Sequence, residues 1–504
     1  MAEEISRKGH PKGLYVLFAT EMWERFNYYG MRAVLVLFMT KALMYNEVFS
    51  SQLYGSYTSL VYLTPLIGGY VADRYWGNKR SIISGGLIMA IGEFILFFCG
   101  STYESSPQLS TALFYSGLGF MIAGNGFFKP NISSMVGQLY PKGDRRIDAA
   151  YTIFYMGINV GGALGPFICG LVGDTGNPAD FKWAFLAAGT GMIISVIVQK
   201  VFHTKYVRDP QGHLLGLTPK DSPKGATSPL LIVGGLIALS LLMIGMLYVD
   251  VQVFSYLAYL LIASAIFIAI LVFADKSLTN IEKQRIGVIF IVAFFVVFFW
   301  SAYEQAGASL TFFADQQTQR DLGFFVVPAS WFQSLNSIFI IILAPLFAFF
   351  WLKLGKREPS SPTKMAWGLL LLALGYLWIA FGVKDVNPGV RVSMIWLTGM
   401  YFLHTCGELC LSPIGLSLVN KLAPFKFASL LMAVWFLANA AANKLAGILS
   451  ALYPSNGRTT SFLGYQMTNM NEFFMLFVFM SGTAALILFI ISVKLKKMMH
   501  LDKP

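Results

Sequence analysis

The feature that most constrains the fold of this chain is a long succession of apolar stretches, each roughly 20 residues long. A helix of this length crosses the hydrocarbon core of a bilayer, where every backbone polar group has to be bonded within the protein. The sequence therefore predicts an all-α polytopic membrane protein with fourteen transmembrane helices. The predicted helices begin near Leu14, Leu53, Ser81, Thr111, Ala149, Lys182, Pro229, Phe254, Ile286, Phe325, Lys364, Val392, Phe427 and Glu472.

The basic residues of the loops predict the orientation of these helices. Lys and Arg precede the first stretch and follow the second, whereas residues 101–109 after the third contain neither. Because cytoplasmic loops carry the excess of Lys and Arg, both termini are expected in the cytoplasm. The net charge of +12 then reflects contact with anionic lipid, so no nucleic-acid partner is needed to explain it.

The spacing of the stretches predicts three regions. Residues 1–203 form a six-helix bundle, residues 204–285 form cytoplasmic loops with two accessory transmembrane helices, and residues 286–504 form a second six-helix bundle. Two six-helix halves resemble the major facilitator fold, in which the halves move around a central site. The accessory pair, 229–250 and 254–275, has almost no polarity, which indicates a lipid-facing scaffold without a role in transport.

A cluster of charges lies inside the first apolar stretch. At helical spacing Glu21, Arg25 and Arg32 fall on one stripe with Tyr29, and Glu24 lies at its edge. Each charge in mid-membrane costs about 2.5 to 3.5 kcal/mol, so such groups are usually paired and functional. The cluster predicts a proton relay or a substrate site, and a purely structural network that holds the helix is the alternative.

Other polar and small residues interrupt later stretches. Lys129 lies in the fourth, where it is either a site residue or a lysine that reaches toward the interface, and Glu408 lies in the twelfth. Gly157, Gly161 and Gly165 recur every fourth residue in the fifth stretch, which predicts close packing against a neighbouring helix.

Six motifs resemble the proton-dependent oligopeptide transporter (POT) family, a branch of the major facilitator superfamily. The first is the charge cluster itself. The others are residues 124–133, 154–159, 300–305 followed by 309–315, 332–336 and 407–413. The resemblance covers nearly the whole chain. The short link 384–391 and the two extra central helices resemble bacterial members, which implies location in the inner membrane.

The resemblance implies a proton-coupled symporter that imports di- and tripeptides by alternating access. It assigns the peptide carboxylate to Arg32 and Lys129, and the amine to Glu408. Asn159 and Asn336 are expected to bond the peptide's amide groups and amino terminus. The remaining pocket residues implied by the resemblance are Tyr29, Tyr62, Tyr155, Trp300, Trp435 and Ser412.

The resemblance also implies proton coupling through Glu21, Glu24 and Arg25, with Glu304 as a further protonation position. A carboxylate beside a cation favours the charged form, whereas loss of the pair favours the acid, so any of these carboxyls can take the proton. The loop 69–80 resembles a superfamily signature. Its charged residues are expected to gate the cytoplasmic ends of the halves, and they are Asp73, Arg74, Lys79 and Arg80.

Other classes of function have weaker support. The five His lie mostly in loops or tails, and no glycine loop for phosphate is present, so neither an enzyme nor an ATP-driven pump is expected. His404, Cys406 and Cys410 lack the spacing of a metal site and are expected to be buried core residues. No cofactor besides the coupling proton and no obligate protein partner is expected. Transport of another small solute, such as nitrate or a modified peptide, and a peptide sensor derived from a transporter remain alternatives.

Overall fold

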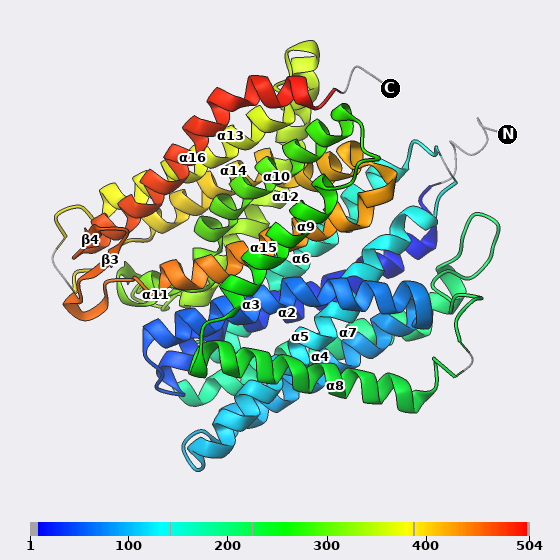
Figure 1. Ribbon diagram of the computed structural model, residues 1–504. Helices are drawn as coiled ribbons and strands as arrows, with labels where there is room; N and C mark the ends of the chain where they lie inside the picture. The colour runs from blue at the N-terminus through cyan, green and yellow to red at the C-terminus, as the bar shows by residue number, and fades with distance from the viewer. Residues whose placement is uncertain (1–8, 142, 224, 387–388, 501–504) are drawn as a thin grey trace. The chain divides into compact units, whose positions relative to one another are not determined.

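Long helices make up most of the protein (Figure 1). The computed structural model describes residues 9–141, 143–223, 225–386 and 389–500. Within them, the helices of 17 or more residues are α2 (Lys12–Lys41), α3 (Glu47–Val71), α4 (Asn78–Thr102), α5 (Pro107–Gln138), α6 (Ile147–Gly173), α7 (Phe181–Tyr206), α8 (Pro229–Tyr248), α9 (Leu257–Phe273), α10 (Asn280–Tyr303), α12 (Phe332–Leu354), α13 (Ser361–Gly382), α14 (Met394–Leu422), α15 (Ala428–Ser450) and α16 (Met470–Met498).

Short elements connect several of these helices. The helical ones used below are η1 (Ala72–Trp76), η3 (Val249–Val253), η4 (Glu304–Gly307), α11 (Ser309–Gln316) and η5 (Ala329–Trp331). Two small sheets complete the described part of the chain. β1 (Thr318–Gln319) pairs in parallel with β2 (Val392–Ser393), and β3 (Thr460–Phe462) pairs antiparallel with β4 (Tyr465–Met467).

Each long helix covers one of the predicted apolar stretches, but the tenth stretch begins later than predicted. We predicted a start near Phe325, whereas α12 begins at Phe332. The backbone before it forms a turn, because Leu322 N donates to Phe325 O and Val327 N donates to Arg320 O. Hydropathy alone misplaced this boundary. Residues 325–327 are apolar, but the backbones of Phe325 and Val327 make hydrogen bonds within a turn and do not continue the helix.

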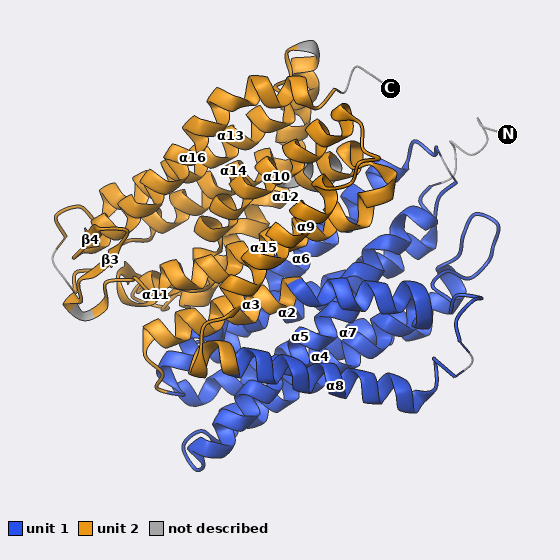
Figure 2. Ribbon diagram, in the orientation of Figure 1, with its two compact units in different colours: residues 1–43, 63–248 blue, residues 44–62, 249–504 orange. Residues whose placement is uncertain are grey.

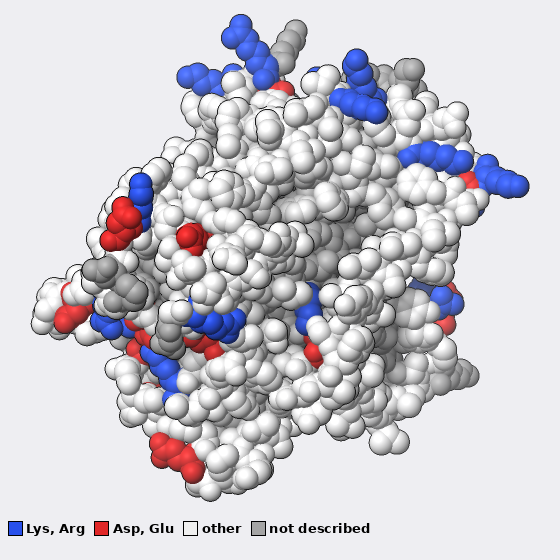
Figure 3. Space-filling model, turned by 60° about the vertical axis from the view of Figure 1, so that its left-hand side comes forward, with Lys and Arg blue, Asp and Glu red and all other residues white. Residues whose placement is uncertain are grey.

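The protein is a multi-pass membrane protein. Among the described residues, 9 helical segments are long and apolar enough to cross a bilayer, and α9 is a shorter apolar helix. The long helices α2, α3, α5 and α14 are not among these segments. Large uncharged areas surround the charged side chains on the face drawn in Figure 3. The count of fourteen crossings and the cytoplasmic termini stay predictions.

The helices group into two compact units (Figure 2). Unit 1 contains residues 1–43 and 63–248, and unit 2 contains residues 44–62 and 249–504. The helix α3 is shared, since its first part belongs to unit 2 and its second part to unit 1. Of the accessory pair, α8 packs on α5 within unit 1 and α9 packs on α15 within unit 2. The division at 203 and 285 into two bundles and a middle region stays a prediction.

The accessory pair is apolar as predicted, but it contains one buried charge at the end of its first stretch, to which we gave no role. Asp250 in η3 is 3% exposed, and its Oδ2 lies 2.5 Å from the Nζ of Lys444 on α15. Ser56 on α3 donates its hydroxyl to the same oxygen at 2.6 Å, and Leu257 N donates to the other carboxylate oxygen at 2.8 Å. The start of α9 is therefore fixed to α3 and α15 by an ion pair and hydrogen bonds, in addition to apolar packing.

Unit 2 contains a second Lys–Asp pair that serves as a natural control. Lys426 Nζ also lies 2.5 Å from a carboxylate oxygen, that of Asp275, but the Lys426 side chain is 60% exposed. The hydrogen bond from the Lys426 ammonium holds the pKa of the Asp275 carboxyl well below its ordinary value. The two pairs thus share one distance and differ in burial.

We predict that Lys444→Met destabilises the protein far more than Lys426→Met. Removing Lys444 leaves Asp250 charged and buried, which costs about 3 to 5 kcal/mol, whereas water already screens the exposed pair. Thermal unfolding of the purified variants in detergent measures the difference. Equal melting temperatures for the two variants would show that the buried pair does not hold α9.

Candidate functional site

The charge cluster of α2 is buried and internally paired. Arg25 Nε donates to Glu21 Oε1 at 2.9 Å and lies 2.7 Å from Glu24 Oε2. The exposed fractions are 2% for Glu21, 0% for Glu24 and 3% for Arg25. Two carboxylates therefore share one guanidinium away from solvent. With both acids ionised the trio carries one excess negative charge, so it has room for a proton or a second cation.

Helix α5 supplies polar partners to this trio within unit 1. Asn125 Nδ2 donates to Glu24 Oε1 at 3.2 Å. Lys129 follows one turn later on α5 and interacts electrostatically with Glu24. The structure thus brings together the predicted residues of α2 and the predicted lysine of α5, and Glu24 is the group that they share.

Arg32 lies about two helical turns after Arg25 on α2 and contacts aromatic rings. Its guanidinium carbon is 5.0 Å from the centre of the Tyr29 ring and 5.9 Å from that of Tyr28. The two rings meet edge to face at 5.4 Å. A guanidinium can stack on aromatic faces, and its planar edge suits a carboxylate.

Asn159 and Tyr155 lie on α6 in the same unit. Asn159 is buried, and its Nδ2 donates to the Tyr155 carbonyl oxygen at 2.9 Å, so the amide is held within its own helix. The Tyr155 side chain is half-buried. Both residues are therefore placed in unit 1 with Arg32 and Lys129.

The glycines of α6 determine how closely α2 approaches, as predicted. A Cβ atom at Gly161 would lie 2.1 Å from the Met22 carbonyl oxygen and 2.9 Å from Arg25 Cβ. At Gly165 it would lie 2.5 Å from the Phe26 carbonyl oxygen. Because no side chain fits between the two backbones, the position of Arg25 depends on glycine at position 161.

Glu408 of α14 is the centre of a polar group in unit 2. It is 8% exposed, and its Oε2 accepts the Tyr303 hydroxyl at 2.5 Å and Asn336 Nδ2 at 2.9 Å. Asn336 also bonds to the Tyr303 hydroxyl and to Thr405 Oγ1. The group joins α10, α12 and α14. Both neighbours of Glu408 named here are neutral donors, in contrast to the guanidinium of the α2 trio.

The other predicted residues of unit 2 lie in varied surroundings. Trp300 meets the Tyr303 ring edge to face at 5.1 Å. Trp435 is 7% exposed, and a Cβ at Gly415 would lie 2.0 Å from its ring. Glu304 is buried in η4, and Tyr62 on α3 is half-buried. Ser412 belongs to α14, but its side chain lies outside the described residues.

The predicted gating residues lie around η1 and the start of α4. Lys79 Nζ donates to Thr204 Oγ1 at 2.8 Å, and Arg80 donates to Thr218 Oγ1 at 2.6 Å. Asp73 and Arg74 are exposed in η1. Gly77, between Arg74 and Lys79, has φ +77°, and a Cβ there would lie 2.4 Å from the Leu217 carbonyl oxygen. Lys79 therefore bonds to the last turn of α7, and Arg80 bonds to the segment that follows α7, within unit 1.

Several residues in these groups had no role predicted from the sequence. Tyr303 lies inside a motif that we singled out, directly before Glu304, but its hydroxyl had no predicted role. Asn125 and Thr405 likewise lie within a turn of predicted residues. Glu93 on α4 was also missed, although the argument that a charge in an apolar stretch needs a partner applies to it equally.

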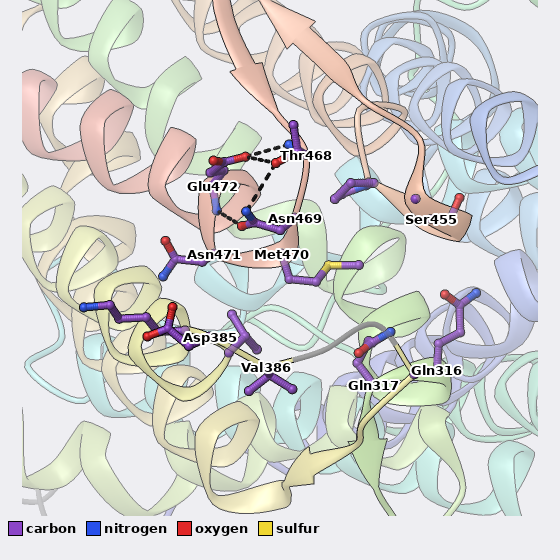
Figure 4. A pocket seen from close by; sticks show the side chains of 15 residues that line it. Gln316, Gln317, Asp385, Val386, Ser455, Thr468, Asn469, Met470, Asn471 and Glu472 are labelled. Carbon is purple, nitrogen blue, oxygen red and sulfur yellow. Dashed lines mark hydrogen bonds between the residues drawn. The ribbon is translucent and has the colours of Figure 1, made fainter.

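A cavity of about 770 Å³ in unit 2 has a different lining (Figure 4). Its polar side chains include Gln316, Asp385 and Glu472. Glu472 Oε2 accepts from the nitrogen and the hydroxyl of Thr468, and Glu472 N donates to Asn469 Oδ1. These bonds cap the start of α16. None of the predicted substrate or proton residues lines this cavity, so we do not assign the substrate site to it.

Comparisons with known proteins agree with the motifs. The sequence profile of the POT family matches residues 79–210 and 275–460. The chain is 34% identical over 460 residues to the peptide transporter YePEPT of Yersinia enterocolitica, covering 88% of both chains. It is 32% identical over 465 residues to a di-/tripeptide transporter of Lactococcus lactis subsp. cremoris, covering 88% of this chain and 90% of that one.

Solved structures agree in fold. A crystal structure of the peptide transporter POT in complex with sulfate matches this protein with a TM-score of 0.81 and 34% identity. The match covers 98% of this chain and 96% of that chain. Nearly all of the described helices therefore have counterparts in one transporter structure.

We predict that Gly161→Ala displaces α2 from α6 and lowers stability by about 1 to 3 kcal/mol, because the added methyl group overlaps backbone atoms. Gly234→Ala on α8 is the matched control, since a Cβ there meets nothing within 4 Å. The control is expected to be neutral or slightly stabilising, because alanine favours a helix. Thermal unfolding in detergent measures both, and a Gly161→Ala protein as stable as the control would contradict the packing argument.

Proposed function

This chain belongs to the POT family, and on that premise we propose that it is a symporter that imports di- and tripeptides together with protons by alternating access. The observation that carries the proposal is the buried trio in which Glu21 and Glu24 share Arg25. Two carboxylates with one guanidinium carry an excess negative charge, which a proton can neutralise within the membrane. The two relatives are a peptide transporter and a di-/tripeptide transporter, which supports peptides as the substrate.

Proton coupling follows from the competition for Glu24. Arg25, Asn125 and Lys129 all interact with this carboxylate. When a proton neutralises Glu24, the attraction that holds Lys129 toward it weakens, and Lys129 becomes available for another anion. Glu21 keeps its bond to Arg25 in this step and stabilises the guanidinium. Glu304 in unit 2 is assigned as a further protonation position.

A peptide offers groups that match the predicted binding residues. Its carboxylate is assigned to Arg32, whose planar fork suits two oxygens, and to Lys129, which acts as a point charge. Its amine is assigned to Glu408, whose present partners are neutral donors that an ammonium can displace or adjoin. Asn159 and Asn336 bond the peptide's amides and amino terminus. The aromatic residues among the predicted lining tolerate side chains of different shapes.

The same proposal includes the location and orientation of the protein. Both termini are assigned to the cytoplasm, because Lys and Arg alternate between successive loops. The protein is assigned to the inner membrane, because its short link 384–391 resembles that of bacterial members. Asp73, Arg74, Lys79 and Arg80 are assigned to gating on the cytoplasmic side. The bonds from Lys79 to Thr204 and from Arg80 to Thr218 support this, since they can open and close as the end of α7 and the segment after it move.

Uptake of labelled dialanine into liposomes tests the proposal. At zero membrane potential, an inward gradient of one pH unit supports about tenfold accumulation if one proton accompanies each peptide. We expect this accumulation from the unaltered protein and none from Glu21→Gln or Lys129→Ala. At least one of the two variants is expected to retain exchange of peptide across the membrane, because exchange needs binding and no net proton movement.

The exposed acid Glu104 provides the control for this assay. Glu104→Gln makes the same chemical change outside the buried groups and is expected to accumulate dialanine normally. Accumulation by the unaltered protein that does not respond to the gradient would refute proton coupling. Absence of both dialanine and trialanine uptake under any gradient would refute peptide transport.

We also predict that Tyr303→Phe raises the KM for dialanine by about tenfold. The variant keeps the ring but removes the donor to Glu408, and a bond to a charged group contributes about 1.5 to 3 kcal/mol. Tyr401→Phe on α14 is the control for loss of a buried hydroxyl in the same helix region. Initial rates of uptake against peptide concentration give the KM. An unchanged KM would show that Tyr303 does not position Glu408 for the peptide.

A further inference from the structure

Glu93 is a buried acid that the proposed transport cycle does not use. It is the acidic residue of α4, within unit 1, and it is 0% exposed. Asn27 of α2 donates from Nδ2 to Glu93 Oε1 at 2.9 Å and to the Ala188 carbonyl oxygen of α7 at 3.1 Å. One amide thus links α2, α4 and α7, and it lies two residues after Arg25 in the sequence.

No cation accompanies this acid in the part of the chain that the structure describes. From α2 it meets the neutral amide of Asn27, and from α7 it meets Gly189, where a Cβ would lie 3.0 Å from Glu93 Cβ. The titratable group nearby is the buried thiol of Cys169 on α6. An ionised carboxylate in such surroundings would be buried without a counter-ion, which is very costly, whereas a neutral acid needs only hydrogen bonds.

The pattern of hydrogen bonds also fits the neutral acid. Among the described residues, Glu93 Oε2 and Asn27 Oδ1 are both buried and have no partner. A proton on Glu93 Oε2 supplies a donor, and Asn27 Oδ1 is an acceptor on the other side of the same pair. A carboxylic acid and an amide can therefore form two complementary bonds. A carboxylate cannot, since it accepts only.

We propose that Glu93 is a further proton-binding residue of this protein, which in its protonated form pairs with Asn27 and holds α2 to α4 and α7. Glu93 is a positioning residue, because it acts on the Glu21–Arg25–Glu24 trio through α2. Loss of its proton breaks one of the two bonds and leaves a bare charge, so α2 loosens. This inference does not depend on which solute the protein carries.

The variant Glu93→Gln tests the pairing with Asn27 separately from the titration of the acid. The amide of Glu93→Gln can donate to Asn27 Oδ1 and accept from Asn27 Nδ2, so it imitates the protonated acid but cannot titrate. We expect the infrared spectrum of the purified protein at neutral pH to contain the carbonyl band of a protonated carboxylic acid that Glu93→Gln lacks. Glu24→Gln and Glu21→Gln identify any bands that come from the trio.

The pH dependence of stability gives a second readout. Folding with Glu93 protonated takes up a proton at neutral pH, so the folding equilibrium constant falls about tenfold per pH unit as the pH rises. We expect the melting temperature of the unaltered protein to fall more between about pH 5 and pH 9 than that of Glu93→Gln. The two values are expected to converge only near about pH 4, where the unfolded chain also holds the proton. Glu93→Ala is expected to melt lower at every pH, because it cannot pair.

The infrared and melting measurements can each overturn the proposal. If Glu93→Gln keeps the infrared band and the pH dependence of the unaltered protein, Glu93 is ionised and the proposal fails. Should Glu93→Gln not fold, Asn27→Ala tests the pair alone, since it leaves the acid in place and removes its partner. The acid band is then expected to shift because its hydrogen bond is lost, and an unshifted band refutes the pairing. Neither measurement uses peptide uptake, so failure here is distinct from failure of the transport proposal.

Discussion

The cost of burying a charge in a bilayer governs the arrangement of the buried charged groups in the described part of this protein. A charge that is not matched in hydrocarbon destabilises the fold by several kcal/mol, so each buried charge has to meet a counter-charge or a set of donors. Arg25 meets two carboxylates, and Lys444 meets Asp250. The glycines of α6 belong to the same requirement, because the trio forms only where α2 can approach closely.

The acids of the two candidate site groups, the trio of α2 and Glu408, are matched by different chemistry. In unit 1 the trio of α2 is ionic, and α5 adds an amide and a lysine that compete for Glu24. In unit 2 Glu408 accepts from a phenol and an amide, which can make room for an incoming ammonium. Glu93 illustrates a third solution, since a carboxyl with one amide partner is best satisfied when it is neutral. Counter-charge, neutral donors and protonation each make a buried acid tolerable.

Apolar periodicity predicted the long helices well, because the length of a bilayer-crossing helix is set by the bilayer itself. It misplaced the start of α12, where turn bonds between residues 320 and 327 override hydropathy. It also treated the accessory pair as uniformly apolar and passed over Asp250, whose partner Lys444 is 194 residues away along the chain. For the candidate site, the stripe on α2 was readable from helical spacing. The partners Asn125, Tyr303 and Thr405 were not, because they come from other helices.

The amino-acid sequence by itself determined the polytopic helical class, the family motifs and the residues that cannot be left unpaired in a membrane. These follow from composition and from spacing along one helix, which are local properties. Only the tertiary structure decided which side chains are partners in hydrogen bonds and ion pairs. These pairs are Glu24 with Asn125, Glu408 with Tyr303 and Asn336, Asp250 with Lys444, and Glu93 with Asn27. The physical reason is that a hydrogen bond or ion pair needs atoms within about 3 Å, and residues far apart in the sequence reach that distance only when helices pack.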